Sequence, residues 1–161
     1  MDSVSISFLI NLNDVTDRSA IINKVNYNDA TGLGYSVNVS SPSPNQRFNF
    51  GAIPKNFDCS STNYDLSDII DNGVNITANK WYHVVAIFTD SVQKIYINGS
   101  LASSFKQNFA TLNRCSNNPY LLIGCWWSGD VISLHGSMDE LRIYNRALNQ
   151  DEITQLAKPV L

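Results

Sequence analysis

The stretch KWYHVVAIFTDSVQKIYINGSLASSF, residues 80–105, decides the fold class. Residues 81–88 are apolar on both faces, which is typical of a strand in the interior of a sheet. After a polar turn, residues 94–99 return as a second strand and end in Asn-Gly, a dipeptide that two-residue hairpin turns favour. Residues 100–105 leave this turn as a third strand. The stretch therefore predicts antiparallel strand pairing.

Shorter strands are predicted before this stretch. Residues 3–12 alternate apolar and polar side chains, the period of a half-buried strand. Residues 19–25, 33–39 and 46–52 give three more strands, separated by turns rich in Asn, Asp, Gly, Ser and Pro. Residues 53–80 are the least regular, and we expect loops there with one or two short strands.

The C-terminal part adds two strands and a helix. Residues 120–124 and 137–144 have strand patterns. Residues 149–157 predict a short helix, because Asn149 is a good N-cap and Glu152 occupies the capping-box position. Many short strands followed by one terminal helix predict an all-β antiparallel sandwich rather than an α/β protein.

Composition limits the classes of partner. The length of 161 residues fits one domain, residues 1–161. The formal net charge is -3 and no basic run could track phosphates, so nucleic acid is not an expected partner. No apolar stretch approaches the roughly 20 residues that span a bilayer, so membrane insertion is not expected. The first residues lack the features of a signal peptide.

The chain has three cysteines, Cys59, Cys115 and Cys125, without the C-x-x-C spacing of zinc sites. A Cys115–Cys125 disulfide, a disulfide that includes Cys59, and free buried thiols all remain open.

Four segments, in this order, resemble the laminin-G-like, concanavalin A-type jelly-roll modules common in secreted bacterial proteins. They are KWYHVVAIF (80–88), KIYINGSL (94–101), LLIG (121–124) and GSMDELRIYNRALNQDEI (136–153). The resemblance implies an antiparallel jelly-roll β-sandwich with one short C-terminal helix, in a module of a larger extracellular or cell-surface protein. It does not fix the function, because lectins, carbohydrate-binding modules, adhesion modules and glycanases share this architecture.

Modules of this family usually carry a further segment before the strand that residues 5–12 match. We therefore expect the domain to lack an N-terminal segment usual in the family. A sheet edge exposed in this way invites a partner strand, so an edge-strand dimer is one expectation.

Catalysis is not expected. Glycanases that share this jelly roll carry a strand motif E-x-D-x-x-E with two catalytic glutamates. This chain has only Glu140 and Glu152, twelve residues apart in different elements, so the motif cannot form. His83 and His135 are interpreted as structural or surface residues, since no G-x-S-x-G or H-E-x-x-H motif accompanies them.

Asp139 is a candidate for an unusual environment. It shares strand alternation with Leu141 and Ile143, which predicts that its carboxylate lies against the core, where an unpaired charge is unfavourable. Arg142, Arg146 or backbone amides could compensate the charge.

Calcium is the alternative partner of Asp139, since the ion prefers hard oxygen ligands. Asp130, Asp90 and nearby carbonyls are the other candidate ligands. Related modules often hold calcium, but their ligands vary too much to be assigned residue by residue.

Aromatic residues are the candidate ligand contacts. The resemblance makes Trp81 a core residue. Trp126 and Trp127 follow a strand end, where an exposed indole could stack on the apolar face of a sugar. Neighbours in an extended segment point in opposite directions, so we expect Trp126 to pack inward and Trp127 to face solvent or ligand. Asp130 lies close by in the sequence, and Tyr27 and Asn28 belong to another loop that could join the same rim.

These features predict a non-catalytic carbohydrate-binding module, with calcium as an optional loop-ordering ion. The alternative is a protein-interaction, adhesion or structural module whose loops contact another domain.

Overall fold

The computed structural model describes residues 3–15, 18–24, 34–40, 46–52, 69–71, 73, 75–107, 112, 121–125 and 132–158. Its elements are, in order, β1 (Ser3–Leu12), β2 (Ser19–Asn23), β3 (Tyr35–Val39), β4 (Phe48–Ala52), β5 (Ile69–Asp71), β6 (Trp81–Thr89), β7 (Val92–Ile97), β8 (Ser100–Lys106), β9 (Leu122–Ile123), β10 (Gly136–Tyr144) and α1 (Gln150–Leu156). The strands and terminal helix expected from the sequence are therefore present. The short β5 falls in the irregular region 53–80.

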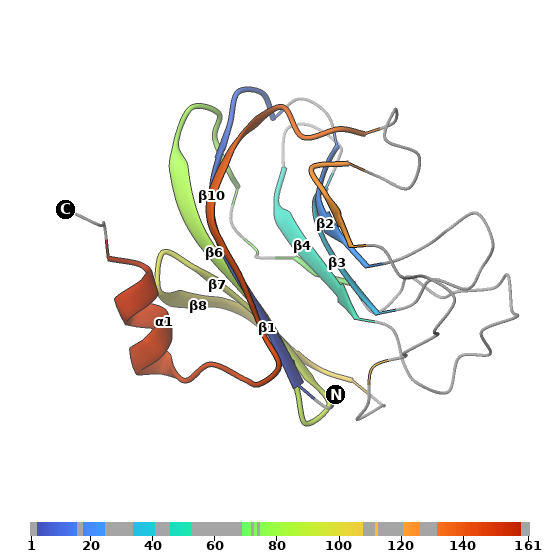
Figure 1. Cartoon of the computed structure of the whole chain (residues 1–161), viewed down its shortest axis with the longest axis vertical. Helices are drawn as coiled ribbons and strands as arrows, with labels where there is room; N and C mark the ends of the chain where they lie inside the picture. Colours follow the sequence, from blue (N-terminus) through green and yellow to red (C-terminus); the bar gives the residue numbers. More distant parts are fainter. Residues whose placement is uncertain are drawn as a thin grey trace, which may run out of the picture.

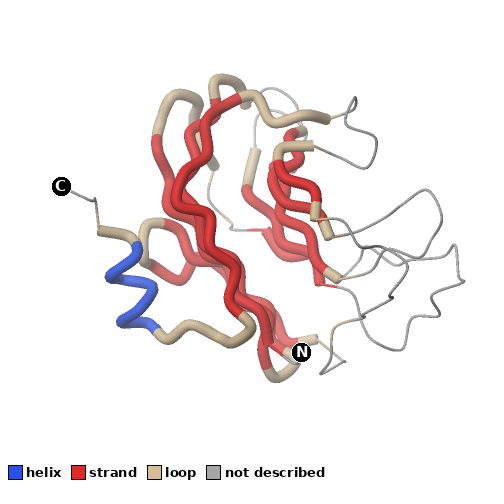
Figure 2. Tube along the Cα trace, in the orientation of Figure 1, coloured by secondary structure: helices blue, strands red, loops and turns tan. Residues whose placement is uncertain are grey.

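Two five-stranded sheets face each other (Figure 1). Sheet A has the strand order β10-β1-β6-β7-β8, and sheet B has the order β5-β4-β3-β2-β9. The paired strands run antiparallel in both sheets. The helix α1 lies against sheet A on the side away from sheet B (Figure 2). This arrangement confirms the predicted jelly-roll β-sandwich with one short C-terminal helix.

The strand β1 supplies the centre of the core. Its alternate residues Val4, Ile6, Phe8, Ile10 and Leu12 are at most 1% exposed and pack between the sheets. The strand pairs with β10 on one side and β6 on the other. Burial of five apolar side chains from one strand makes β1 a large contributor to the hydrophobic stabilisation of the sandwich.

The apolar character of β6 on both faces has two separate causes. Val84 and Phe88 point into the core between the sheets. Val85 and Ile87 point outward and are buried in a second apolar cluster with Ile153 of α1. The helix therefore covers part of the outer face of sheet A and makes β6 an interior strand.

The expectation that Trp81 is a core residue, drawn from the resemblance, is wrong. Trp81 is 49% exposed rather than part of the core. Side chains of a strand alternate between faces, and Tyr82 is the residue that enters the core. Trp81 therefore projects from the outer face of sheet A, as Val85 does, but it is not part of the cluster under α1.

The predicted position of Asp139 against the core is wrong, because β10 contains a β-bulge. Leu9 pairs with Asp139, whereas Ser7 pairs with Arg142, so β10 has one residue more than β1 in this interval. The bulge includes Glu140, whose φ of 55° lies in the left-handed region. The extra residue breaks the alternation, so that Leu141 packs on the core while Asp139 is exposed.

The two arginines expected near Asp139 have other partners. Arg142 forms an ion pair with Glu140. Arg146 binds Glu152 with both guanidinium nitrogens, at 2.6 and 2.8 Å. The carboxylate of Asp139 instead accepts a hydrogen bond from the backbone N–H of Glu140 at 2.7 Å, so of the expected partners only a backbone amide is observed.

The predicted Asn-Gly hairpin turn joins β7 to β8. Asn98 and Gly99 have φ values of 51° and 82°, the left-handed conformations that favour this dipeptide. The side-chain oxygen of Asn98 accepts a hydrogen bond from the backbone N–H of His83 at 2.9 Å. The carbonyl of Gly99 accepts another from the side chain of Gln150 at 2.8 Å. The turn thus contacts both β6 and α1.

The start of α1 forms the predicted capping box. The side chain of Asn149 accepts from the backbone N–H of Glu152, and the Glu152 carboxylate accepts from the backbone N–H of Asn149, both at 2.9 Å. No helix among the described residues is long and apolar enough to cross a membrane.

A buried serine anchors the segment that leads into α1. Ser5 of β1 is fully buried, and its hydroxyl donates to the carbonyl of Arg146 at 2.8 Å. The same oxygen accepts a hydrogen bond from the backbone N–H of Leu148 at 3.0 Å. One hydroxyl therefore satisfies two backbone groups of the connection between β10 and α1.

Of the cysteines, only Cys125 lies within the described residues, where it is half-buried. Its thiol is free, which contradicts the predicted Cys115–Cys125 disulfide. Cys59 and Cys115 lie outside the described residues, so a disulfide between them and free thiols at both positions remain open.

Gly136 begins β10 where this strand lies close to β1. A Cβ atom at this position would overlap the carbonyl oxygen of Asn11 and lie 3.0 Å from the Cα atom of Leu12. We expect Gly136→Ala to lower the free energy of unfolding by about 1–3 kcal/mol, because two paired backbones would have to separate. Urea denaturation measures the change. Ser137→Ala, an exposed neighbour on β10, is the control, and equal stability of the two variants would contradict the prediction.

Ser5→Ala should lower the free energy of unfolding by about 1–3 kcal/mol, because the buried N–H of Leu148 loses its partner. Ser100→Ala removes a hydroxyl from an exposed position of β8 and should change stability by less than about 0.5 kcal/mol. Chemical denaturation of both variants tests the difference, and a Ser5→Ala protein as stable as the control would refute the anchoring role.

Candidate functional site

The ligand contacts predicted from the sequence, Trp126, Trp127, Asp130, Tyr27 and Asn28, lie outside the described residues. They remain predictions.

The described calcium candidates do not come together. Asp139 pairs with Leu9, whereas Asp90 follows Thr89, the partner of Ser3. Ser3 and Leu9 are six residues apart on β1, about 20 Å along an extended strand, so one ion cannot bind both carboxylates. Among the described residues, no group of three or more His, Cys, Asp or Glu side chains could hold a metal ion. Asp130 lies outside them.

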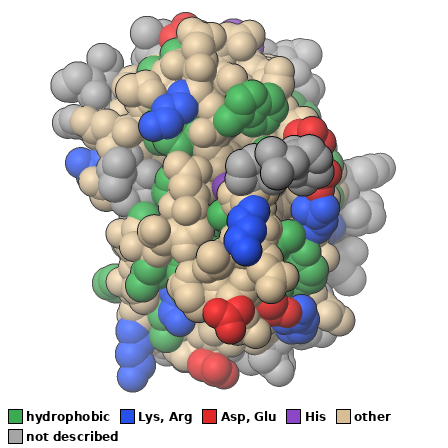
Figure 3. All heavy atoms as spheres, turned by 90° about the vertical axis from the view of Figure 1, so that its left-hand side faces the viewer, with side chains coloured by type: hydrophobic (Ala, Val, Ile, Leu, Met, Phe, Trp, Pro, Cys, Tyr) green, Lys and Arg blue, Asp and Glu red, His purple; other side chains and the backbone are tan. Residues whose placement is uncertain are grey.

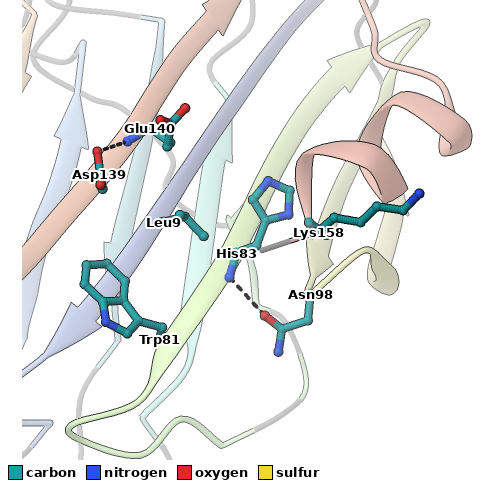
Figure 4. A pocket seen from close by; sticks show the side chains of 8 residues that line it. Leu9, Trp81, His83, Asn98, Asp139, Glu140 and Lys158 are labelled. Atoms are coloured by element: carbon teal, nitrogen blue, oxygen red, sulfur yellow. Dashed lines mark hydrogen bonds between the residues drawn. The ribbon is translucent and has the colours of Figure 1, made fainter. Parts of the chain in front are cut away.

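The structure contains a groove on the outer face of sheet A, beside the C-terminal end of α1 (Figure 4). Figure 3 views the molecule from the side on which α1 lies. The volume of the groove is about 630 Å³, within the range of small-molecule sites. Its lining comes from β1, β6, β10, the β7–β8 turn and the end of α1, namely Leu9, Trp81, His83, Asn98, Asp139, Glu140, Ala157 and Lys158.

Strand pairing positions the floor of the groove. Leu9 of β1 lies directly opposite His83 of β6, and Trp81 is the next residue of β6 on the same face. Figure 4 shows the indole of Trp81 and the side chain of Leu9 on one side of His83, with the end of α1 on the other. The exposed indole and Leu9 give the groove an apolar surface.

His83 provides a polar atom within this surface. Its side chain is buried, and its Nε2 atom forms a hydrogen bond with the hydroxyl of Ser7 at 3.0 Å. The Nδ1 atom is buried and has no hydrogen-bond partner within the part of the chain that the structure describes. Burial, aided by the positive charge of Arg142, lowers the pKa of His83 to about 4. The ring is therefore neutral at pH 7, with one nitrogen as donor and the other as acceptor.

The rim of the groove carries charged and amide groups. The carboxylate of Asp139 is exposed, and that of Glu140 is paired with Arg142. The ammonium group of Lys158 points away from His83, so the aliphatic part of this side chain lines the groove (Figure 4). The groove therefore combines an apolar floor with carboxylate, amide and imidazole groups, an arrangement suited to a ligand with one apolar face and a fringe of hydroxyl groups.

Sequence reasoning missed this groove because it assigned Trp81 and His83 to structural roles. A signal was present, since strand alternation places both residues on the face opposite to Tyr82. The contributions of Asp139 and Lys158 could not be found in this way, because they depend on the β-bulge and on the position of α1.

The low pKa of His83 predicts a loss of stability in acid. Because the folded-state pKa lies below the ordinary value of 6.5, the contribution of His83 is fully present above pH 6.5. It should fall by about 1–3 kcal/mol as the pH decreases from 6.5 to 4. Chemical denaturation across this range, compared with His83→Gln, isolates the effect from the carboxylates. Parallel pH profiles for the two proteins would show that His83 does not contribute.

Known structures share this fold. A Bacteroides ovatus protein, provisionally assigned as carbohydrate-binding, is 16% identical with a TM-score of 0.70, covering 96% of this chain and 40% of its own. Domain 4 of the extracellular arabinanase AbnA from Geobacillus stearothermophilus, in complex with arabinotriose, is 21% identical with a TM-score of 0.65, covering 98% and 67%. The heptameric SAP-like pentraxin of Limulus polyphemus is 18% identical with a TM-score of 0.67, covering 98% and 70%.

At these identities the likeness concerns the fold alone. The chain spans less than half of the Bacteroides ovatus protein. No curated protein sequence matches it.

The sequence also matches the model of a protein family. A laminin G model, described as the concanavalin A-like lectin/glucanases superfamily, matches residues 1–154. This match covers nearly the whole chain and agrees with the resemblance seen in residues 80–153. The chain belongs to the concanavalin A-like lectin/glucanase superfamily.

Proposed function

We propose that this chain is a non-catalytic carbohydrate-binding module of a larger secreted or cell-surface protein. The observation that carries the proposal is that both glutamates of the chain are bound to arginines within a superfamily that contains lectins and glucanases. A glucanase of this architecture needs two free glutamates at one site. Glu140 and Glu152 are instead part of the structure around the bulge and α1.

Glu152 shows this most clearly. Its carboxylate binds Arg146 and also accepts the backbone N–H of Asn149. These interactions lower the pKa of Glu152 to about 2, with the Arg146 hydrogen bond as the largest cause. A carboxylate that stays ionised at neutral pH cannot act as the general acid of glycoside hydrolysis.

The structural neighbours support binding of glycans. The arabinanase domain was solved with arabinotriose. Another neighbour is botulinum neurotoxin type C, whose cell entry depends on interaction with two ganglioside molecules. By analogy, the proposed module would attach its parent protein to a glycan outside the cell.

The alternative function is a protein-interaction or adhesion module. It is favoured by β8, an edge strand of sheet A on which Leu101 and Phe105 are 52% and 49% exposed. Such an edge could pair with a second copy or with another domain. Light scattering over a range of concentrations tests the dimer, and a mass that stays monomeric would count against it.

A glycan array followed by calorimetry tests carbohydrate binding. We expect the intact protein to bind at least one glycan and Trp127→Ala to weaken this binding about tenfold or more, because it removes a stacking surface. Trp126→Ala is the matched control and should lower stability more than affinity. If the folded protein binds no glycan on the array, the interaction module becomes the better explanation.

A further inference from the structure

We propose that the groove between Trp81 and His83 is a saccharide-binding subsite. It would take one uncharged sugar ring, with its apolar face on the Trp81 indole and a hydroxyl hydrogen-bonded to His83 Nδ1. The inference rests on the proposed carbohydrate-binding function and gives it a site that is independent of Trp126 and Trp127.

The indole of Trp81 is the first element of this site. It is half exposed although it belongs to a strand whose next seven residues are all buried. A single exposed aromatic residue is ordinary on a protein surface. Trp81, however, lines a groove whose floor continues into Leu9, so a ligand ring can contact apolar surface there and still reach polar groups.

His83 is the second and independent element. Its side chain is 4% exposed, yet Nδ1 has no hydrogen-bond partner among the described residues. Buried polar atoms in proteins nearly always have a partner, and His83 lines the groove, so the unpaired Nδ1 points to a ligand group. Because Nδ1 itself is buried, the hydroxyl reaches it when a flexible lining side chain such as Lys158 moves aside. Either tautomer of the ring is compatible with the Ser7 hydroxyl, which can donate or accept. A sugar hydroxyl can likewise donate or accept, so it fits Nδ1 in both tautomers.

The spacing of the two residues fits a single ring. Trp81 and His83 are two residues apart on one face of β6, which places their Cα atoms about 6.6 Å apart. A monosaccharide with its hydroxyl groups covers a comparable distance. One ring could therefore lie over the indole and extend a hydroxyl toward the imidazole.

The charges around the groove favour a neutral ligand. Arg142 already neutralises Glu140, and the ammonium group of Lys158 points away from the groove. Among the described residues that line the groove, the remaining charge is the carboxylate of Asp139, which can accept a hydrogen bond from a hydroxyl group but would repel an acidic sugar. No described cation is directed into the groove to pair with a carboxylate or phosphate.

Calorimetry with the full chain and soluble neutral oligosaccharides tests the site. The panel contains arabino-, xylo-, cello- and laminari-oligosaccharides, together with sialylated glycans. We expect Trp81→Ala to weaken binding of a neutral oligosaccharide at least about tenfold. Phe105→Ala is the matched control, because it removes an aromatic ring with the same 49% exposure from β8, outside the groove, and should leave affinity unchanged.

Nitrogen NMR of the histidine rings gives a second readout that does not depend on a variant of buried His83. The Nδ1 resonance of His83 should shift on saturation with the bound oligosaccharide, whereas the ring resonances of His135 should not. A Trp81→Ala protein with unchanged affinity, or a His83 resonance unaffected by saturation, would overturn the proposal.

The same experiments distinguish a failure of the proposed carbohydrate-binding function from a failure of the proposed site. If the folded, unmodified chain binds no glycan, both the function and this site are refuted. If it binds glycan and only Trp127→Ala reduces affinity, the function stands and the groove is not the site. Binding that is restricted to sialylated glycans would also overturn the inference of a neutral ring.

Discussion

The double pairing of β1 is the constraint on which the rest of the structure depends. Its inward side chains form the centre of the core between the two sheets. Its outward residues have a different task at each position: Ser5 holds the segment before α1, Ser7 binds the ring of His83, and Leu9 lies on the floor of the groove. Because one strand carries all three residues, its register in sheet A sets where these contacts to the helix segment and the groove are made.

Much of the fold follows from local sequence patterns. Alternation over residues 3–12 predicted which face of β1 is buried, and the Asn-Gly pair predicted the β7–β8 turn. The capping box at Asn149 and Glu152 also formed as predicted. These features depend on residues close together in the sequence, where turn chemistry and side-chain period are decisive. The resemblance to a known family extended the prediction to the arrangement of the sheets.

The errors have one physical origin, since each depends on contacts between distant segments. The bulge at Glu140 has no sequence signal, because a left-handed conformation is uncommon for glutamate and is imposed here by the pairing of β10 with β1. That single extra residue moved Asp139 from the expected core position to the rim of the groove. Likewise, the exposure of Trp81 depends on how far α1 extends across sheet A. Strand alternation could therefore indicate Trp81 and His83, but not the residues that distant segments bring to the groove.

The contacts of the β7–β8 turn have a consequence for engineering the chain. Short exposed hairpin turns are usually the preferred positions for peptide insertion or for new termini in circular permutation. Here the Asn98 side chain holds the backbone of β6, and the Gly99 carbonyl holds Gln150 of α1. An insertion at this turn would separate the hairpin from the helix and from the strand that carries His83. This turn is thus a poor position for grafting a tag or a second domain, although its length and exposure suggest otherwise.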